Sequence, residues 1–214
     1  MEKRYLITQS LLSAWLYQYN CAEGYEEEAR ESFLKTLRRE PTEPSEAMER
    51  GIAFENAVYE TIRGNDTAMT AYTMQWSKRG GEVQEGACIL DLAEELGSGT
   101  YQLTAYKEKT IAGEKFLLMA KCDWVKAGTI YDSKRVEHYE VGKYYASPQH
   151  PMYLEVLDGA RAFEYKICDG MDIYTERYTR ADIPQTIDSI ITEFTESLKR
   201  EGLWETYAKL WQTK

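Results

Sequence analysis

The chain has 214 residues, of which 43% are hydrophobic and 29% are charged, so it suits one globular domain with a sizeable core. Its formal net charge of -10 argues against a protein that coats nucleic acid through the phosphates, because such proteins are basic. This charge still allows an enzyme whose bound metal ions supply positive charge in a small groove.

No apolar run reaches the roughly 18 residues of a membrane span, and the N-terminus carries no long apolar segment typical of a signal peptide. The cysteines are far apart and form no CxxC pair, which predicts neither a disulfide framework nor a zinc site. We therefore expect a cytoplasmic protein without membrane contact. The four cysteines are Cys21, Cys88, Cys122 and Cys168.

Helices are expected in the N-terminal part, residues 1–64. Thr8 can cap a first helix with an apolar face, and an acidic helix surface follows over residues 23–31. Ser45 to Ile62 predicts a further helix, closed by Gly64. The apolar face of the first helix comprises Leu11, Leu12, Trp15, Leu16 and Tyr19.

Residues 65–180 are expected to hold the sheet. Residues 64–87 predict irregular chain or short strands, with a turn at Gly80-Gly81. A helix is expected from Ser147-Pro148 to Gly159, and a C-terminal helical part, residues 181–214, begins at Asp182 and breaks at Gly202. The expected strands are Thr100–Lys109, Lys115–Val125, Thr129–Val136, Ala162–Ile167 and Met171–Tyr178, the last two joined as a hairpin across Asp169-Gly170.

The stretch from Leu117 to Val136 carries the clearest chemical signal. Two apolar strands meet at a turn near Ala127-Gly128, and a symmetric turn would pair Val125 with Ile130. That register places Asp123 opposite Asp132, and two carboxylates across a ladder repel each other unless a cation lies between them.

Strand alternation places Asp132 and Lys134 on the same face of the strand as Ile130, and this face is otherwise apolar. Burial of an acid and a lysine costs free energy unless they are paired or hold a metal. Two carboxylates and a lysine on adjacent strands suit Mg²⁺ or Mn²⁺, which activates water at a phosphorus centre. The alternative is a structural Asp132–Lys134 salt bridge, with Asp123 at a strand end.

Two further features accompany this pair of strands. At helical spacing, the neighbours of Glu55 are apolar: Ile52, Val58, Tyr59 and Ile62. If Glu55 lies within this apolar stripe, its carboxylate needs a partner such as a metal ion or Lys134. The alternative is that Glu55 lies at the edge of the stripe and reaches water. Gln149 and Tyr153 project from one helical face and can hold a DNA backbone or order a lysine.

These four features, in this order, resemble the RecB-like and Cas4-like branch of the PD-(D/E)XK nucleases. That branch shows an acid or histidine on a helix, then Asp, then (D/E)xK, then QxxxY. The N-terminal segment TQSLLSAW also looks like the helix that opens such proteins. The corresponding residues are Glu55, Asp123, Asp132-Ser133-Lys134, and Gln149 with Tyr153.

The resemblance implies a restriction-endonuclease-like α/β fold, a mixed β-sheet flanked by helices. It implies Mg²⁺ or Mn²⁺ held by Glu55, Asp123, Asp132 and the main-chain carbonyl of Ser133, with Lys134 acting on the attacking water. Gln149 and Tyr153 would then order the site or contact the substrate. The implied activity is DNA phosphodiester hydrolysis, exonuclease-like, with association to phage or mobile-element recombination partners.

The chain departs from the family pattern in three ways. The middle acid is Asp132 where Glu is common, and no cysteine follows Cys168, so we expect no iron–sulfur cluster. The sequence shows no helicase motif, so we expect a stand-alone nuclease module. Two alternatives to a metal-dependent nuclease stay open: a non-catalytic nucleic-acid-binding or assembly module that retains the fold, and an interaction protein with a chance motif. The last predicts that Glu55 lies far from Asp123.

Overall fold

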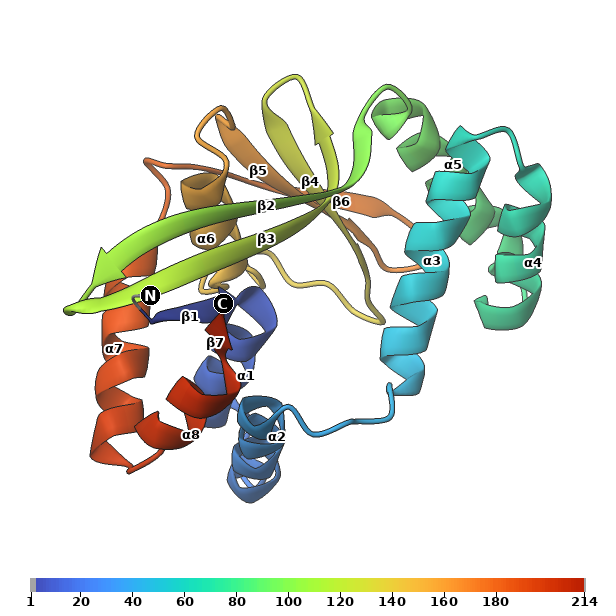
Figure 1. Ribbon diagram of the computed structural model, residues 1–214. Helices are drawn as coiled ribbons and strands as arrows, with labels where there is room; N and C mark the ends of the chain where they lie inside the picture. The colour runs from blue at the N-terminus through green and yellow to red at the C-terminus, as the bar shows by residue number, and fades with distance from the viewer. Residues whose placement is uncertain (1–2, 214) are drawn as a thin grey trace.

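A long antiparallel hairpin, β2 (Thr100–Ile111) with β3 (Glu114–Lys126), crosses the middle of the molecule (Figure 1). The computed structural model describes residues 3–213, apart from the side chain of Asp66. Over this range the chain forms an open, mixed seven-stranded sheet in the order β6-β5-β4-β3-β1-β7, with β2 paired to β3. The other strands are β1 (Arg4–Thr8), β4 (Thr129–Arg135), β5 (Ala162–Cys168), β6 (Ile173–Thr179) and β7 (Gln212–Thr213).

Helices flank this sheet in two groups. The first group lies near β1 and the chain ends, and the second group packs at the far end of the sheet (Figure 1). The predicted mixed α/β fold, consistent with a restriction-endonuclease-like arrangement, is therefore confirmed. The helices are α1 (Gln9–Asn20), α2 (Glu26–Arg38), α3 (Glu46–Ile62), α4 (Asp66–Trp76), α5 (Glu82–Leu96), α6 (Gln149–Val156), α7 (Ile187–Arg200) and α8 (Trp204–Leu210).

Local signals in the sequence explain several helix starts. The Thr8 side chain accepts a hydrogen bond from the Leu11 amide, so the expected cap is formed. Ser45, where the second helix was expected to begin, is the N-cap of α3 and accepts a hydrogen bond from the Met48 amide. Leu11 and Leu12 are buried as predicted, whereas Tyr19 of the same predicted face is 54% exposed.

The expectation of irregular chain or strands over residues 64–87 is wrong. The chain there folds into α4 and the first part of α5, joined at the predicted turn, where Gly80 has a φ of 86°. Aromatic and threonine residues in α4 favour a strand locally. Packing of α4 and α5 against α3 overrides that preference and buries Ile89 and Leu92.

Other boundaries also differ from the prediction. Strands β1 and β7 went unpredicted, because five and two residues are too few to show an alternating pattern. The C-terminal helix begins at Ile187 with Thr186 as its cap, because Asp182 accepts hydrogen bonds from Thr179 in a turn instead. Helix α6 follows Pro148, its N-cap, and ends three residues before Gly159.

Two apolar clusters hold these layers together. The larger packs β1 and β3 against α1, α6, α7 and α8, with Phe116, Leu118 and Phe194 fully buried. The smaller packs α3 and α5 against Trp124 at the end of β3. Cys122 and Cys168 are buried as expected. Among the described residues, no helix has the length and apolar character needed to cross a membrane.

One edge of β3 is divided between two partners. Strand β2 pairs with β3 from Glu114 to Val125, except at Asp123, so β1 and β4 must share the opposite edge. The β1 ladder extends along β3 to Met119, and the β4 ladder begins at Trp124. Residues 120–123 lie outside both ladders, and β4 separates from β3 at this point, which opens the sheet.

Candidate active site

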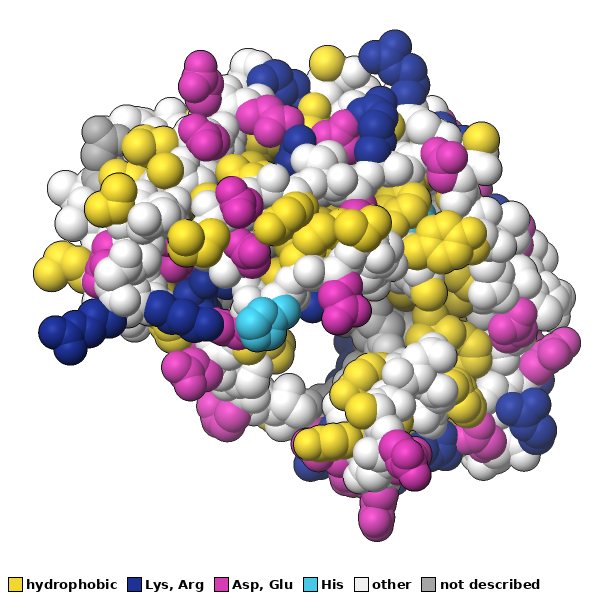
Figure 2. All heavy atoms as spheres, turned by 180° about the vertical axis from the view of Figure 1, so that it is seen from behind, with side chains coloured by type: hydrophobic (Ala, Val, Ile, Leu, Met, Phe, Trp, Pro, Cys, Tyr) yellow, Lys and Arg dark blue, Asp and Glu magenta, His cyan; other side chains and the backbone are white. Residues whose placement is uncertain are grey.

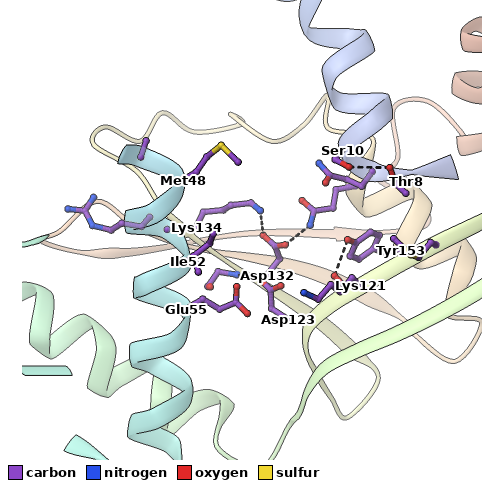
Figure 3. Close-up of a pocket in the computed structure, with 17 residues that line it drawn as sticks. Thr8, Ser10, Met48, Ile52, Glu55, Lys121, Asp123, Asp132, Lys134 and Tyr153 are labelled. Atoms are coloured by element: carbon purple, nitrogen blue, oxygen red, sulfur yellow. Dashed lines mark hydrogen bonds and ion pairs between the residues drawn. The ribbon is translucent and has the colours of Figure 1, made fainter. Parts of the chain in front are cut away.

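An open pocket of about 530 Å³ lies at this opening, between α3 and the N-terminus of α1 (Figure 3). Its walls include every residue that the sequence predicts for the site, even though these residues come from α3, β3, β4 and α6. The predicted residues that line it are Glu55, Asp123, Asp132, Ser133, Lys134, Gln149 and Tyr153.

The separation of β4 from β3 explains how Asp123 and Asp132 come together. The predicted register holds, with Val125 opposite Ile130, and the last pair of the ladder is Trp124 with Tyr131. The next two residues are the acids. The backbone amide of Ser133 donates a hydrogen bond to Asp123 Oδ2 at 3.2 Å. A side-chain oxygen therefore replaces the main-chain acceptor that this amide would have if the β3–β4 pairing continued.

Asp132 is only 3% exposed, and its two oxygens have different neighbours. Gln149 Nε2 of α6 donates to Oδ1, and Lys134 Nζ lies 2.5 Å from Oδ2. The salt bridge considered as the structural alternative is therefore present. It lies inside a pocket with two further acids, so its presence is compatible with either role.

Glu55 reaches the pocket from α3, and its carboxyl group points toward Asp123 (Figure 3). The predicted apolar stripe around it is only partly right, because Val58 is buried whereas Ile52 is 56% exposed. Glu55 therefore lies at the border of the buried face. Its carboxylate accepts a hydrogen bond from Gln102 Nε2 of β2.

Asp132 and Glu55 lie close enough to Asp123 for their charges to affect its ionisation. Burial raises the pKa of Asp123 well above its ordinary value, and the charges of Asp132 and Glu55 raise it further. The positive charge of Lys134 opposes this rise in the pKa of Asp123. Burial alone would lower the pKa of Lys134, but Asp132 and Asp123 raise it overall, so the ammonium stays protonated at neutral pH.

Gln149 and Tyr153 lie behind the acids and are 4% and 5% exposed. Gln149 fixes Asp132, and Tyr153 donates to the main-chain oxygen of Lys121 at 3.0 Å, within the part of β3 that neither β1 nor β4 pairs. Of the two roles predicted for this pair, these contacts favour ordering of the site.

The donor set fits a hard divalent cation by its chemistry, since it offers three carboxylates. Asp132 Oδ2 is buried beside the Lys134 ammonium and accepts no other hydrogen bond, which leaves an electron pair for a cation. As the side chains stand, however, no three acidic, histidine or cysteine groups among the described residues are arranged to hold an ion. Asp132 Oδ2 faces the Lys134 ammonium, so cation binding requires these two side chains to move apart. The bond from Gln102 to Glu55 engages Oε1 and can remain in place.

Several pocket residues were not predicted. Thr8, Gln9 and Ser10 at the start of α1 form the wall opposite α3. The capping pattern and the TQSLLSAW resemblance predicted a helix there but did not assign these residues to the site. Exposed Met48 and Ile52 give the α3 wall an apolar surface.

Figure 2 shows acidic and basic side chains interspersed on the face away from the viewer of Figure 1, without a broad basic patch.

Comparisons with known proteins find no matching protein-family model and no matching curated protein. Similar solved structures include the following two. The crystal structure of SSO0001 is 11% identical, with 94% of this chain and 78% of that chain covered and a TM-score of 0.48. LHK-Exo in complex with dAMP is 15% identical, with 95% and 94% covered and a TM-score of 0.42. At these values the likeness assigns neither a family nor a function.

Proposed function

We propose that the protein is a divalent-metal-dependent nuclease that hydrolyses phosphodiester bonds. One observation carries this proposal: Asp123, Asp132 and Lys134 meet where β4 separates from β3, and Glu55 of α3 lines the same pocket. A purely structural ion pair needs one acid and one lysine. Two additional carboxylates beside it are costly, because like charges repel in a buried place.

Mg²⁺ or Mn²⁺, held by Glu55, Asp123, Asp132 and the Ser133 carbonyl, would lower the pKa of water and stabilise charge on phosphate oxygens. The residues of the chain supply the rest. Lys134, protonated and adjacent to Asp132, orients the attacking water or neutralises charge that develops at the phosphate. Gln149 holds Asp132 in place.

The choice of DNA as substrate, and of an exonuclease-like mode, rests on the motif resemblance. The pocket agrees with a nucleic-acid substrate in one respect. Its α1 wall is polar and its α3 wall is apolar, so a sugar-phosphate chain and a base can each find a suitable surface. The metal ions would supply the positive charge that the acidic protein lacks.

A cleavage assay with a matched pair of lysine variants tests this proposal. Labelled single- and double-stranded DNA are incubated with Mn²⁺ or with chelator. We expect metal-dependent cleavage that falls at least about 100-fold in Lys134→Met, since loss of a charge-stabilising group costs about 10²–10³ in rate. Lys166→Met is the control, because Lys166 also pairs with carboxylates, Glu164 and Glu95, but lies outside the pocket.

The second candidate is a non-catalytic nucleic-acid-binding module. The Asp132–Lys134 ion pair favours it, because the pair is complete without a metal ion. DNA binding without metal-dependent turnover in the same assay would support this candidate and contradict the nuclease. Equal cleavage by Lys134→Met and the wild type would also contradict the proposed role of Lys134.

A further inference from the structure

Gln102 has an unusual backbone conformation at a point opposite the acids. Its φ is 53°, in the left-handed region that non-glycine residues rarely adopt. The other described non-glycine residues with positive φ lie at a helix end, Arg39, or in hairpin turns, Ala112 and Ala127. Gln102 lies within β2, where neither a turn nor a cap accounts for the conformation.

The distortion interrupts the β2–β3 ladder at a single place. Tyr101 pairs with Trp124 and Leu103 pairs with Cys122, so Gln102 and Asp123 would form the intervening pair, but they lie outside the ladder. The strained residue of β2 is therefore the one across from Asp123, the acid that also lies outside the β4 ladder.

The side chain of Gln102 donates a hydrogen bond through Nε2 to the carboxylate of Glu55. A carboxylate only accepts hydrogen bonds, so the Nε2 end of the amide must face it. The neighbouring residue attaches the same helix: the Tyr101 ring stacks on Tyr59 with centroids 3.7 Å apart. Two consecutive residues of β2 therefore fix α3 against the sheet at the level of Glu55.

Left-handed strain in a non-glycine residue persists only where the surroundings impose it, and it concentrates at functional sites. From these observations we infer that Gln102 is a positioning residue: it holds the Glu55 carboxylate beside Asp123 and thereby sets the affinity of the pocket for a divalent cation. This inference rests on the proposed function. A hydrogen bond that orients a metal-binding group from behind typically changes metal affinity or activity by about 10- to 100-fold.

The test compares Gln102→Gly, Gln102→Glu and the control Thr104→Gly in Mn²⁺ titrations by calorimetry, together with thermal unfolding without metal. Glycine adopts the left-handed conformation without strain but lacks the amide, and glutamate keeps the length but cannot donate when ionised. We expect both Gln102 variants to bind Mn²⁺ at least about 10-fold more weakly than wild type. Gln102→Gly should unfold at or above the wild-type temperature.

Thr104 is exposed in the same strand and lies outside the pocket, so Thr104→Gly should keep wild-type Mn²⁺ affinity although it weakens the strand. Mn²⁺ affinity in Gln102→Gly equal to that of wild type would overturn the inference. An equal loss of Mn²⁺ affinity in Gln102→Gly and in the control Thr104→Gly would also overturn it. Absence of Mn²⁺ binding by the wild-type protein would instead contradict the proposed function, so the two failures are distinguishable.

Discussion

Asp132 illustrates what the sequence reveals about single residues and what it leaves out. Its placement on the face of Ile130 and beside Lys134 follows from strand alternation, and the structure has both. The donor Gln149 was recognisable through the QxxxY spacing. Gln102 had no such signal, because its backbone strain and its contact with Glu55 depend on how β2 meets α3 in three dimensions.

His150, next to Gln149, gives a prediction for a single titrating group. It is fully buried, its ring stacks on Tyr178 with centroids 4.2 Å apart, and its Nε2 has no hydrogen-bond partner. Burial lowers its pKa to about 4, although the charge of Glu176 partly opposes this. The unfolded chain, with a histidine pKa of about 6.5, therefore binds more protons between these two values.

The free energy of unfolding should therefore show no loss from His150 above about pH 6.5. It should fall as the pH drops toward 4, and protonation of this group should account for up to roughly 3 kcal/mol of the loss. Urea unfolding of wild type and His150→Phe at about pH 7 and about pH 5 measures it. The phenylalanine variant keeps a ring against Tyr178 but cannot titrate, so its stability should depend less on pH. Parallel pH dependence in the two proteins would contradict the account.

At the scale of elements, prediction succeeded where a pattern repeats within one segment. The strands of the β2–β3–β4 meander and the β5–β6 hairpin were predicted closely from alternation and turn residues. Strand β1 and helix α4 were not. Strand β1 is too short to show a period, and α4 becomes helical through its packing on α3 and α5.

The position of α3 relative to β4 depends on a buried ion cluster that no local pattern shows. Glu85 of α5 is 1% exposed and accepts from Arg135 of β4, from Tyr72 and from Ser77, while Arg50 of α3 lies 3.4 Å away. Burial alone would raise the pKa of Glu85, but the bonds from Arg135, Ser77 and Tyr72 bring it below its ordinary value. This cluster ties the helix of Glu55 to the strand of Asp132.

Glu85→Gln should lower the free energy of unfolding by about 3–5 kcal/mol, because it leaves buried Arg135 without its counter-charge. Glu137→Gln is the matched control. Glu137 also pairs with Arg50, but its side chain is 52% exposed, so the loss should stay below about 1 kcal/mol. Urea unfolding of both variants measures the difference, and equal losses would show that Glu85 has no special part in holding α3.

At the scale of the whole molecule, the site depends on contacts between segments far apart in the chain. Glu55, Asp123 and Gln149 come from three separate parts, and the division of the β3 edge between β1 and β4 leaves the opening where they meet. The motif order predicted which residues would meet. It did not predict the α1 wall, formed where β1 ends against β3 and the chain turns into the helix at Gln9.

The central claim is that three carboxylates from separate parts of the chain share one divalent cation. The most direct measurement is anomalous X-ray diffraction from a crystal soaked in Mn²⁺. The account predicts a single strong peak in the pocket, about 2.0–2.6 Å from oxygens of Asp123 and Asp132 and with Glu55 turned toward it. A map without a peak there, or with Mn²⁺ bound only elsewhere on the surface, would contradict it.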